Sequence, residues 1–182
     1  NGCMNAAVAA LPELDALYVP PVPHDAGCAL GAAMLLTREL AGPVERVAHA
    51  FHGDHYGDED IRDVLASNAV PFHDHGERIV DVVVDELANG RVVGWFQGPM
   101  EIGPRALGAR SLLADPRSAG MKDRINRTIK QREAFQPLAP TVLSTEAQRH
   151  FELRGSSPFM SMVVAAKPGA GEMMPAVIHV DG

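Results

Sequence analysis

Two arginines beside a cluster of glycines form the part of the sequence best suited to chemistry. Arg105 and Arg110 lie in the stretch from Gly94 to Ser111, GWFQGPMEIGPRALGARS, which contains four glycines. Glycine lets backbone N–H groups approach a ligand with no Cβ in the way, and a guanidinium binds phosphate or carboxylate through two parallel hydrogen bonds. The stretch therefore predicts an anion-binding loop. The alternative is a tight Gly/Pro turn whose arginines face water.

A second basic cluster follows on a helix predicted over residues 121–132. Apolar residues recur at every fourth position and define its buried face. Lys122, Asn126 and Lys130 form another row at the same spacing. Unpaired like charges on one face favour an anionic partner, so this face could complete a pocket for a triphosphate or carbamoyl phosphate. A helix face that is only solvated is the alternative.

The distribution of charge sets these clusters apart from the rest of the chain. With 16 Lys+Arg and 23 Asp+Glu the net charge is −7, which argues against general affinity for nucleic acid. Half of the basic residues nevertheless lie in one short segment: Arg105, Arg110, Arg117, Lys122, Arg124, Arg127, Lys130 and Arg132. A basic segment within an acidic chain suits a phosphorylated small molecule better than a long polyanion.

Asp25 is a third candidate, in the turn Pro23 to Gly27 before a Gly/Ala-rich helix. Its carboxylate could cap that helix, or it could bind a metal or nucleotide in a cleft. Five histidines (His49, His52, His55, His73 and His75) lack an HExxH or paired CxxC pattern, so they are interpreted as surface or linker residues.

Periodicity and Gly/Pro breaks predict the elements that must position these residues. Helices are expected in the Ala-rich stretch after Asn5, at 28–40, from 58, at 77–89 and at 121–132, and strands at 17–19, 91–96, 111–114, 141–143, 160–166 and 176–180. Residues 45–57 are predicted to be an interdomain linker. Because helices and strands alternate, the predicted class is α/β, with α+β as the alternative.

Composition points to a globular protein with a sizeable core, at 46% hydrophobic and 21% charged residues. No apolar run approaches the roughly 20 residues that span a bilayer, and the start lacks the pattern of a signal peptide. Two cysteines, Cys3 and Cys28, are too few for a disulfide scaffold and are expected to be small buried residues. A cytoplasmic location and no membrane partner are therefore expected.

Taken together, these motifs resemble the NodU/CmcH family of O-carbamoyltransferases. The matching segments run through the chain in order: Gly2 to Asn5, Asp25 to Ala33, Gly94 to Ser111, Ala114 to Arg117, Met121 to Pro140 and Pro175 to Gly182. The most specific block extends from GPRALG to QPLAP. One departure is Asn1-Gly2, where the family usually has Gly-Gly, which would narrow the room at a nucleotide.

The resemblance implies a two-domain organisation. Residues 1–45 would be the last part of an actin/Hsp70-like (Kae1-like) domain, and residues 46–182 most of a YrdC-like domain with a mixed twisted sheet and helices. The family's upstream histidine pair and a downstream arginine are absent from the sequence, so the chain is expected to be a fragment. On its own such a fragment is expected to have little or no complete transfer activity.

The resemblance also implies a mechanism in two stages. Carbamoyl phosphate and ATP, with Mg²⁺, would form carbamoyl-adenylate, and the carbamoyl group would then pass to a hydroxyl of a sugar or natural-product acceptor. The implied residues are Arg105, Lys130 and Arg132 as catalytic cations, Gly103, Arg110 and Lys122 at the phosphates, Gly2, Asn5 and Gly27 at the nucleotide, and Asp25 as a ligand of iron or another divalent metal.

Two other functions stay open at this point. One is a component of tRNA threonylcarbamoyl modification, against which the GPRALG block and the acidic charge argue. The other is a non-catalytic nucleotide-binding module. The sequence leaves the acceptor and any oligomeric state open.

Overall fold

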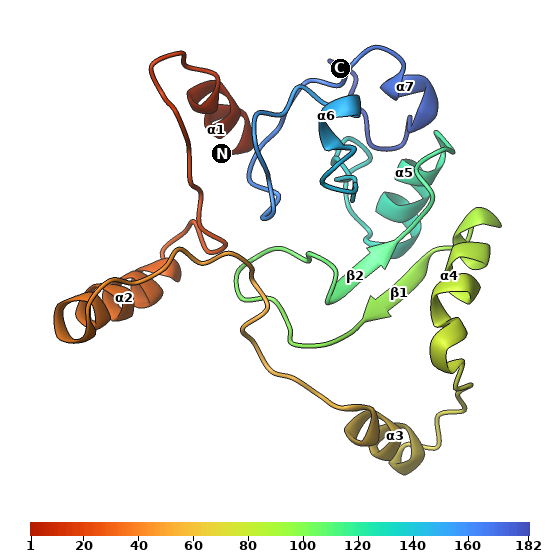
Figure 1. Ribbon diagram of the computed structural model, residues 1–182. Coiled ribbons are helices and arrows are strands. Elements are labelled where there is room, and N and C mark those ends of the chain that lie inside the picture. Colours follow the sequence, from red (N-terminus) through yellow and green to blue (C-terminus); the bar gives the residue numbers. More distant parts are fainter.

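The computed structural model describes residues 1–182 and mixes short helices with one small sheet (Figure 1). The α-helices are α1 (Gly2–Ala9), α2 (Gly27–Ala41), α3 (Asp58–Ser67), α4 (Ile79–Ala88), α5 (Met121–Arg124), α6 (Ala147–His150) and α7 (Ala170–Met173). A 3₁₀ turn, Gly76–Arg78, leads into α4, and a π-helical turn, Ile125–Ile129, follows α5. The predicted mixed class is confirmed at this level.

The sheet is a two-stranded antiparallel hairpin of β1 (Val93–Phe96) and β2 (Arg110–Leu113). Its register pairs Val93 with Leu113 and Phe96 with Arg110. Helix α4 runs beside β1 (Figure 1). The hairpin therefore presents the whole glycine-rich stretch 97–109 as the loop between its strands.

Local sequence explains where two of the helices begin. The side chain of Asn1 caps α1 by accepting hydrogen bonds from the backbone N–H groups of Cys3 and Met4, at 3.1 and 3.2 Å. The carboxylate of Asp60 accepts from the N–H of Gly57 at 2.8 Å and stabilises the start of α3. Three acidic residues in the first turn of α3 also suit the helix dipole.

The prediction of one α-helix over 121–132 is wrong in its second half. After Arg124 the backbone widens into the π-helical turn, in which Lys130 N–H donates to the Ile125 carbonyl at 2.8 Å. Helical structure ends before Lys130, and Gln131 has a positive φ of 47°. The side chain of Asn126 binds carbonyls further along the chain, which draws the backbone out of regular helical spacing.

A small apolar core lies between α5, the end of β2 and the C-terminal segment. Met121, Ile125 and Ala176 are buried in it. Val92, Ala114 and Leu138 pack around them. This core anchors the second basic cluster against residues close to the C-terminus.

Four predicted strands are not strands in the structure. Residues 17–19, 141–143 and 176–180 are irregular or turn, and 160–166 contributes only an isolated bridge between Ala166 and Phe151. β-branched residues favour an extended chain, but a strand needs a partner, and none of these segments pairs with an edge of the hairpin. The 45–57 segment is irregular as predicted, with one bridge from Phe51 to Glu101.

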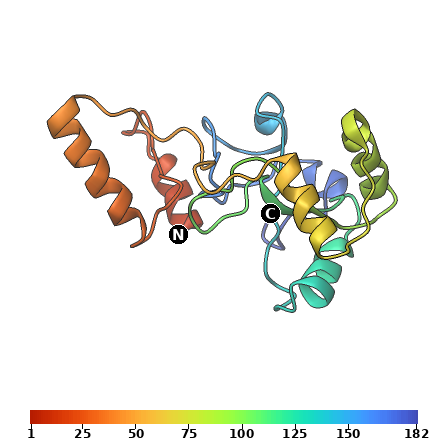
Figure 2. The ribbon, with the colours of Figure 1, turned by 90° about the horizontal axis from the view of Figure 1, so that it is seen from below.

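The N-terminal part of the chain is loosely attached. Helix α1 lies against residues 161–163, where the side chain of Asn5 donates to the Ser161 carbonyl at 2.8 Å. Helix α2 extends away from the remainder of the molecule (Figures 1 and 2). Three of its leucines, Leu35, Leu36 and Leu40, stay exposed, with Leu40 at 78%. The division at residue 45 stays a prediction.

Two further observations concern the surface. Cys3 and Cys28 were expected to be buried, but both are exposed free thiols, because α1 and α2 make few contacts. None of the helices has the length and apolar character needed to cross a membrane.

Candidate anion-binding site

A buried carboxylate organises the loop between β1 and β2. The side chain of Glu101 is fully buried, and its Oε1 accepts hydrogen bonds from the N–H groups of Leu107 and Ala109 at 2.6 and 2.8 Å. Its Oε2 accepts no hydrogen bond, but Arg110 Nε lies 3.3 Å away, at ion-pair distance. The loop is therefore folded around a negative charge.

The charge state of Glu101 follows from two opposing effects. Burial alone would raise the pKa of its carboxyl group, since it disfavours the charged form. The backbone N–H groups of Leu107 and Ala109 favour that form, and together with further backbone donors they hold the pKa below its ordinary value. Glu101 is therefore ionised at neutral pH.

Arg110, predicted to bind phosphate, makes its contacts inside the loop. Besides its ion pair with Glu101, its guanidinium donates to the Gly103 carbonyl at 3.1 Å. Its side chain keeps 41% of its surface exposed. The structure thus places Arg110 beside the loop as one of its internal ties.

Arg105 occupies a part of this loop that no such tie reaches. Gly108 N–H donates to Ser111 Oγ at 3.0 Å, and Gln97 N–H donates to the Ala109 carbonyl at 2.9 Å. The three residues 104–106 are exposed and make no hydrogen bond. The guanidinium of Arg105 also has no ion-pair partner, so it is free to meet an anion.

Gly103 and Gly27 pack against the same short segment from two sides. A Cβ on Gly103 would lie 2.5 Å from the Pro21 carbonyl oxygen, and one on Gly27 would collide with the Val22 carbonyl oxygen. Gly103 also has a φ of +92°. Glycine is therefore required at both positions, and the contacts bring the turn that holds Asp25 close to the loop.

Asp25 does not cap helix α2. The helix begins after Ala26 without a side-chain cap, and the exposed carboxylate of Asp25 makes no hydrogen bond. The predicted alternative of helix capping is thereby excluded. Nowhere in the chain do three or more His, Cys, Asp or Glu side chains gather to hold a metal ion. Asp25 offers one carboxylate, which alone does not fit a complete metal site.

The second basic cluster has its own buried polar side chain. Asn126 is fully buried, and its Nδ2 donates to the carbonyls of Ala134 and Gln136 at 3.3 and 2.8 Å. Its Oδ1 accepts from Arg132 Nε at 2.7 Å, and Arg132 also donates to the Pro137 carbonyl at 3.2 Å. The guanidinium of Arg132 therefore holds residues 130–137 in place.

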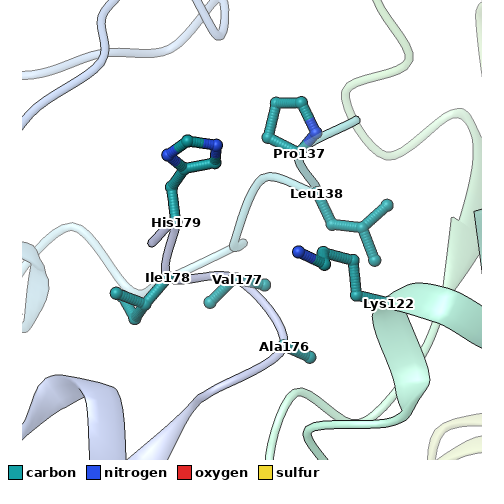
Figure 3. Close-up of a pocket in the computed structure, with 7 residues that line it drawn as sticks. All are labelled: Lys122, Pro137, Leu138, Ala176, Val177, Ile178 and His179. Atoms are coloured by element: carbon teal, nitrogen blue, oxygen red, sulfur yellow. The ribbon is translucent and has the colours of Figure 1, made fainter. Parts of the chain in front are cut away.

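The two lysines of this cluster are left free. Lys130 is exposed and makes no side-chain hydrogen bond or ion pair. Lys122 lines a small pocket, into which its ammonium group points (Figure 3). The other residues around this pocket are Pro137, Leu138, Ala176, Val177, Ile178 and His179.

The two basic clusters extend from different ends of the hairpin. The loop 97–109 joins β1 to β2 at one end, and α5 follows the other end of β2 (Figure 1). The prediction that Arg105 and Lys130 line a single pocket stays a prediction, since no contact in the structure joins them.

The remaining predicted residues hold the N-terminal helix. Gly2 accepts a hydrogen bond from Val163 N–H at 3.2 Å through its carbonyl, and Asn5 binds the Ser161 carbonyl. Their role at a nucleotide stays a prediction.

Sequence reasoning missed Glu101 and the role of the Asn126 amide. The one usable signal for Glu101 was an acidic residue among apolar residues and glycines, because a carboxylate buried there needs hydrogen-bond donors around it.

Comparison with known proteins identifies the family. Residues 84–182 match the family model described as Carbamoyltransferase C-terminus. The chain is 44% identical to nodulation protein NolO of Bradyrhizobium diazoefficiens, over 92% of this chain and 32% of that protein. It is 34% identical to the 3'-hydroxymethylcephem-O-carbamoyltransferase of Streptomyces clavuligerus, over 98% and 32%.

A third relative is nodulation protein U of Sinorhizobium fredii, at 34% identity over 98% of this chain and 30% of that protein. The chain thus spans about a third of the length of these relatives. The family match covers both the loop held by Glu101 and the segment held by Asn126. The chain belongs to the NodU/CmcH family of carbamoyltransferases.

Proposed function

We propose that this chain supplies anion-binding parts of an ATP-dependent O-carbamoyltransferase. The supporting observation is Arg105, an exposed guanidinium without a partner in a loop that is tied down on both sides of it, at Gly103 and at Leu107. A cation presented in this way suits a phosphoryl group, because no contact within the protein has to break when the ligand arrives.

The proposed reaction follows the names of the relatives. One of them is a carbamoyltransferase acting on the oxygen of a hydroxymethyl group. In the proposed scheme, water converts carbamoyl phosphate to carbamate and phosphate, and a carbamate oxygen attacks the α-phosphorus of ATP, which releases pyrophosphate and forms carbamoyl-adenylate. The acceptor hydroxyl then attacks the carbamoyl carbon, loses its proton and displaces AMP. Carbamoyl phosphate and ATP are both polyanions, so fixed cations such as Arg105, Lys122 and Lys130 would stabilise the charge that develops on phosphorus and on leaving phosphate.

Magnesium with ATP also belongs to this proposal, as does a divalent metal for which Asp25 would be a single ligand, since Asp25 belongs to no group of three or more His, Cys, Asp or Glu side chains. A bound metal would supply Lewis-acid charge to phosphate or acceptor oxygens. Asp25 would contribute one carboxylate, from an exposed turn next to Gly27.

Isothermal titration of the chain with ATP and with carbamoyl phosphate tests the proposal. We expect saturable binding of at least one ligand, and about tenfold weaker binding after Arg105→Ala, since a contact to a charged group contributes about 1.5–3 kcal/mol. Arg78→Ala is the matched control, because Arg78 is also exposed and free of ion pairs. Absence of binding, or equal loss in both variants, would reject the proposed site.

A further inference from the structure

We propose that Glu101 is a positioning residue for the bound anion: a buried negative charge that shapes a loop whose task is to bind negative charge. The inference rests on the proposed function, since it assigns to Glu101 the placement of Arg105.

The first step in the argument is the cost of burying Glu101. Burying a carboxylate away from water is unfavourable unless hydrogen-bond donors surround it. Here the donors are two N–H groups of the loop itself, from Leu107 and Ala109, and the guanidinium of Arg110. The loop conformation and the charge of Glu101 therefore depend on each other.

The second step is the attachment of Glu101 to the surrounding chain. Its backbone forms a bridge with Phe51, and the next residue, Ile102, donates its N–H to the Ala50 carbonyl at 2.7 Å. Ala50 is itself buried. The backbone of Glu101 is thus held in place by its neighbours, so its carboxylate has a fixed position around which the loop folds.

The third step is the division of charge. Glu101 and Arg110 neutralise each other, and Arg110 is also tied to the Gly103 carbonyl. Arg105 then carries the net positive charge of the loop, on the exposed residues 104–106. Without Glu101, Arg110 would lose its ion pair, and the ties at 103, 107 and 109 would loosen together. The backbone on both sides of Arg105 would no longer be fixed.

The direction in which Glu101→Gln changes the affinity for the anion separates this role from a purely electrostatic one. Glu101→Gln keeps the shape of the side chain but removes a negative charge close to the anion site. If Glu101 acted only through its field, the substitution would strengthen anion binding. If it positions Arg105, the substitution weakens binding although the net charge becomes more favourable.

The experiment is a double-variant cycle, with carbamoyl phosphate and ATP as probes in calorimetric titrations of the full chain. We expect Glu101→Gln to weaken binding about tenfold in the otherwise unchanged chain, and less than about twofold when Arg105→Ala is already present. Unchanged or tighter binding in Glu101→Gln overturns the inference. So does an equal loss in both backgrounds, because that would mean Glu101 acts independently of Arg105.

A second pair of variants keeps the test valid if Glu101→Gln does not fold. Arg110→Gln breaks the same ion pair from its exposed end and should also weaken binding about tenfold. Arg91→Gln is its control, since Arg91 makes an exposed ion pair with Glu86 at 2.9 Å outside the loop. Equal effects of the two arginine variants contradict the inference. If the unchanged chain binds neither probe, the proposed function fails as a whole, which is a separate result.

Discussion

The two buried polar side chains of this molecule, Glu101 and Asn126, organise two basic segments in different ways. Glu101 is charged and gathers backbone N–H donors around it. Asn126 is neutral and mainly donates to carbonyls, with one guanidinium bound to its oxygen. One segment is therefore folded around an acceptor and the other around a donor.

The difference decides which cations remain available. Around Glu101, the ion pair occupies Arg110 and leaves Arg105 free. Around Asn126, Arg132 is occupied, and the flanking Lys130 is left free. In each segment one arginine stabilises the loop while another cation faces solvent. Residue type alone does not distinguish the two tasks.

The strongest test of the comparison is Asn126→Ala, which should produce the largest loss of stability. It leaves the carbonyls of Ala134 and Gln136 without their donor and opens a cavity at a fully buried site. We expect the free energy of unfolding to fall by about 3 kcal/mol, from unsatisfied groups that cost about 1–3 kcal/mol each. Urea denaturation measures it. A loss below about 1 kcal/mol would show that Asn126 does not organise the segment.

The second test compares two glycines of the same loop. Gly103 and Gly108 both have positive φ, of 92° and 115°, but only at Gly103 would a Cβ meet another backbone, at Pro21. We expect Gly108→Ala to cost about 1 kcal/mol through strain. Gly103→Ala should cost about 2 kcal/mol or more, because it also forces the loop away from its neighbour. Equal melting temperatures for the two variants would contradict the packing seen at Gly103.

Sequence reasoning located both segments but assigned the roles within them incompletely. The basic run and the glycine spacing located the two segments that carry unpaired cations, because charge and backbone freedom are local properties. The internal use of Arg110 and Arg132 depends on acceptors that the fold brings within reach, Glu101 and Asn126, and on the widened helix turn. Those depend on tertiary contacts, which residue spacing does not encode.

The same distinction between local signals and tertiary contacts explains which helices and strands were predicted correctly. Helices α2, α3 and α4 lie within a few residues of their predicted ranges, since Gly42, the acidic turn at residue 58 and Gly90 mark their ends locally. The hairpin strands were also predicted to within two residues. The four incorrect strands had suitable residues but no partner, and pairing is a property of the whole chain.

A third test uses pH to distinguish the charged residue from the neutral one. The folded pKa of Glu101 lies below the unfolded value of about 4.3, so its ionised form stabilises the fold above that pH. This contribution disappears as pH falls through the folded pKa. Glu101→Gln should therefore be less stable than the unchanged chain at neutral pH, by about 1 kcal/mol, since hydrogen bonds to a charged acceptor are stronger than those to a neutral one by about that amount.

The measurement is urea denaturation of both proteins at a series of pH values from neutral to acid. The gap between them should narrow below about pH 4, because the unchanged chain also becomes neutral at this position. Asn126→Ala should show a gap that does not change with pH. A gap of Glu101→Gln that stays constant would mean that the carboxylate is not ionised in the folded chain.

The smallest expected effect concerns two arginines on the same stretch. The guanidinium of Arg132 donates to both Asn126 and the Pro137 carbonyl, whereas Arg127 makes only an exposed ion pair with Asp123 at 3.7 Å. Lysine carries the same charge but cannot make two hydrogen bonds in the fixed geometry of a guanidinium. We expect Arg132→Lys to lower the free energy of unfolding by about 1 kcal/mol, the usual contribution of one hydrogen bond. Arg127→Lys should change it by less than about 0.5 kcal/mol, because exposed ion pairs contribute little. Both values come from urea denaturation at one salt concentration. If the two substitutions have the same effect, the guanidinium of Arg132 does not hold the loop, and its contact with Asn126 is incidental to the fold.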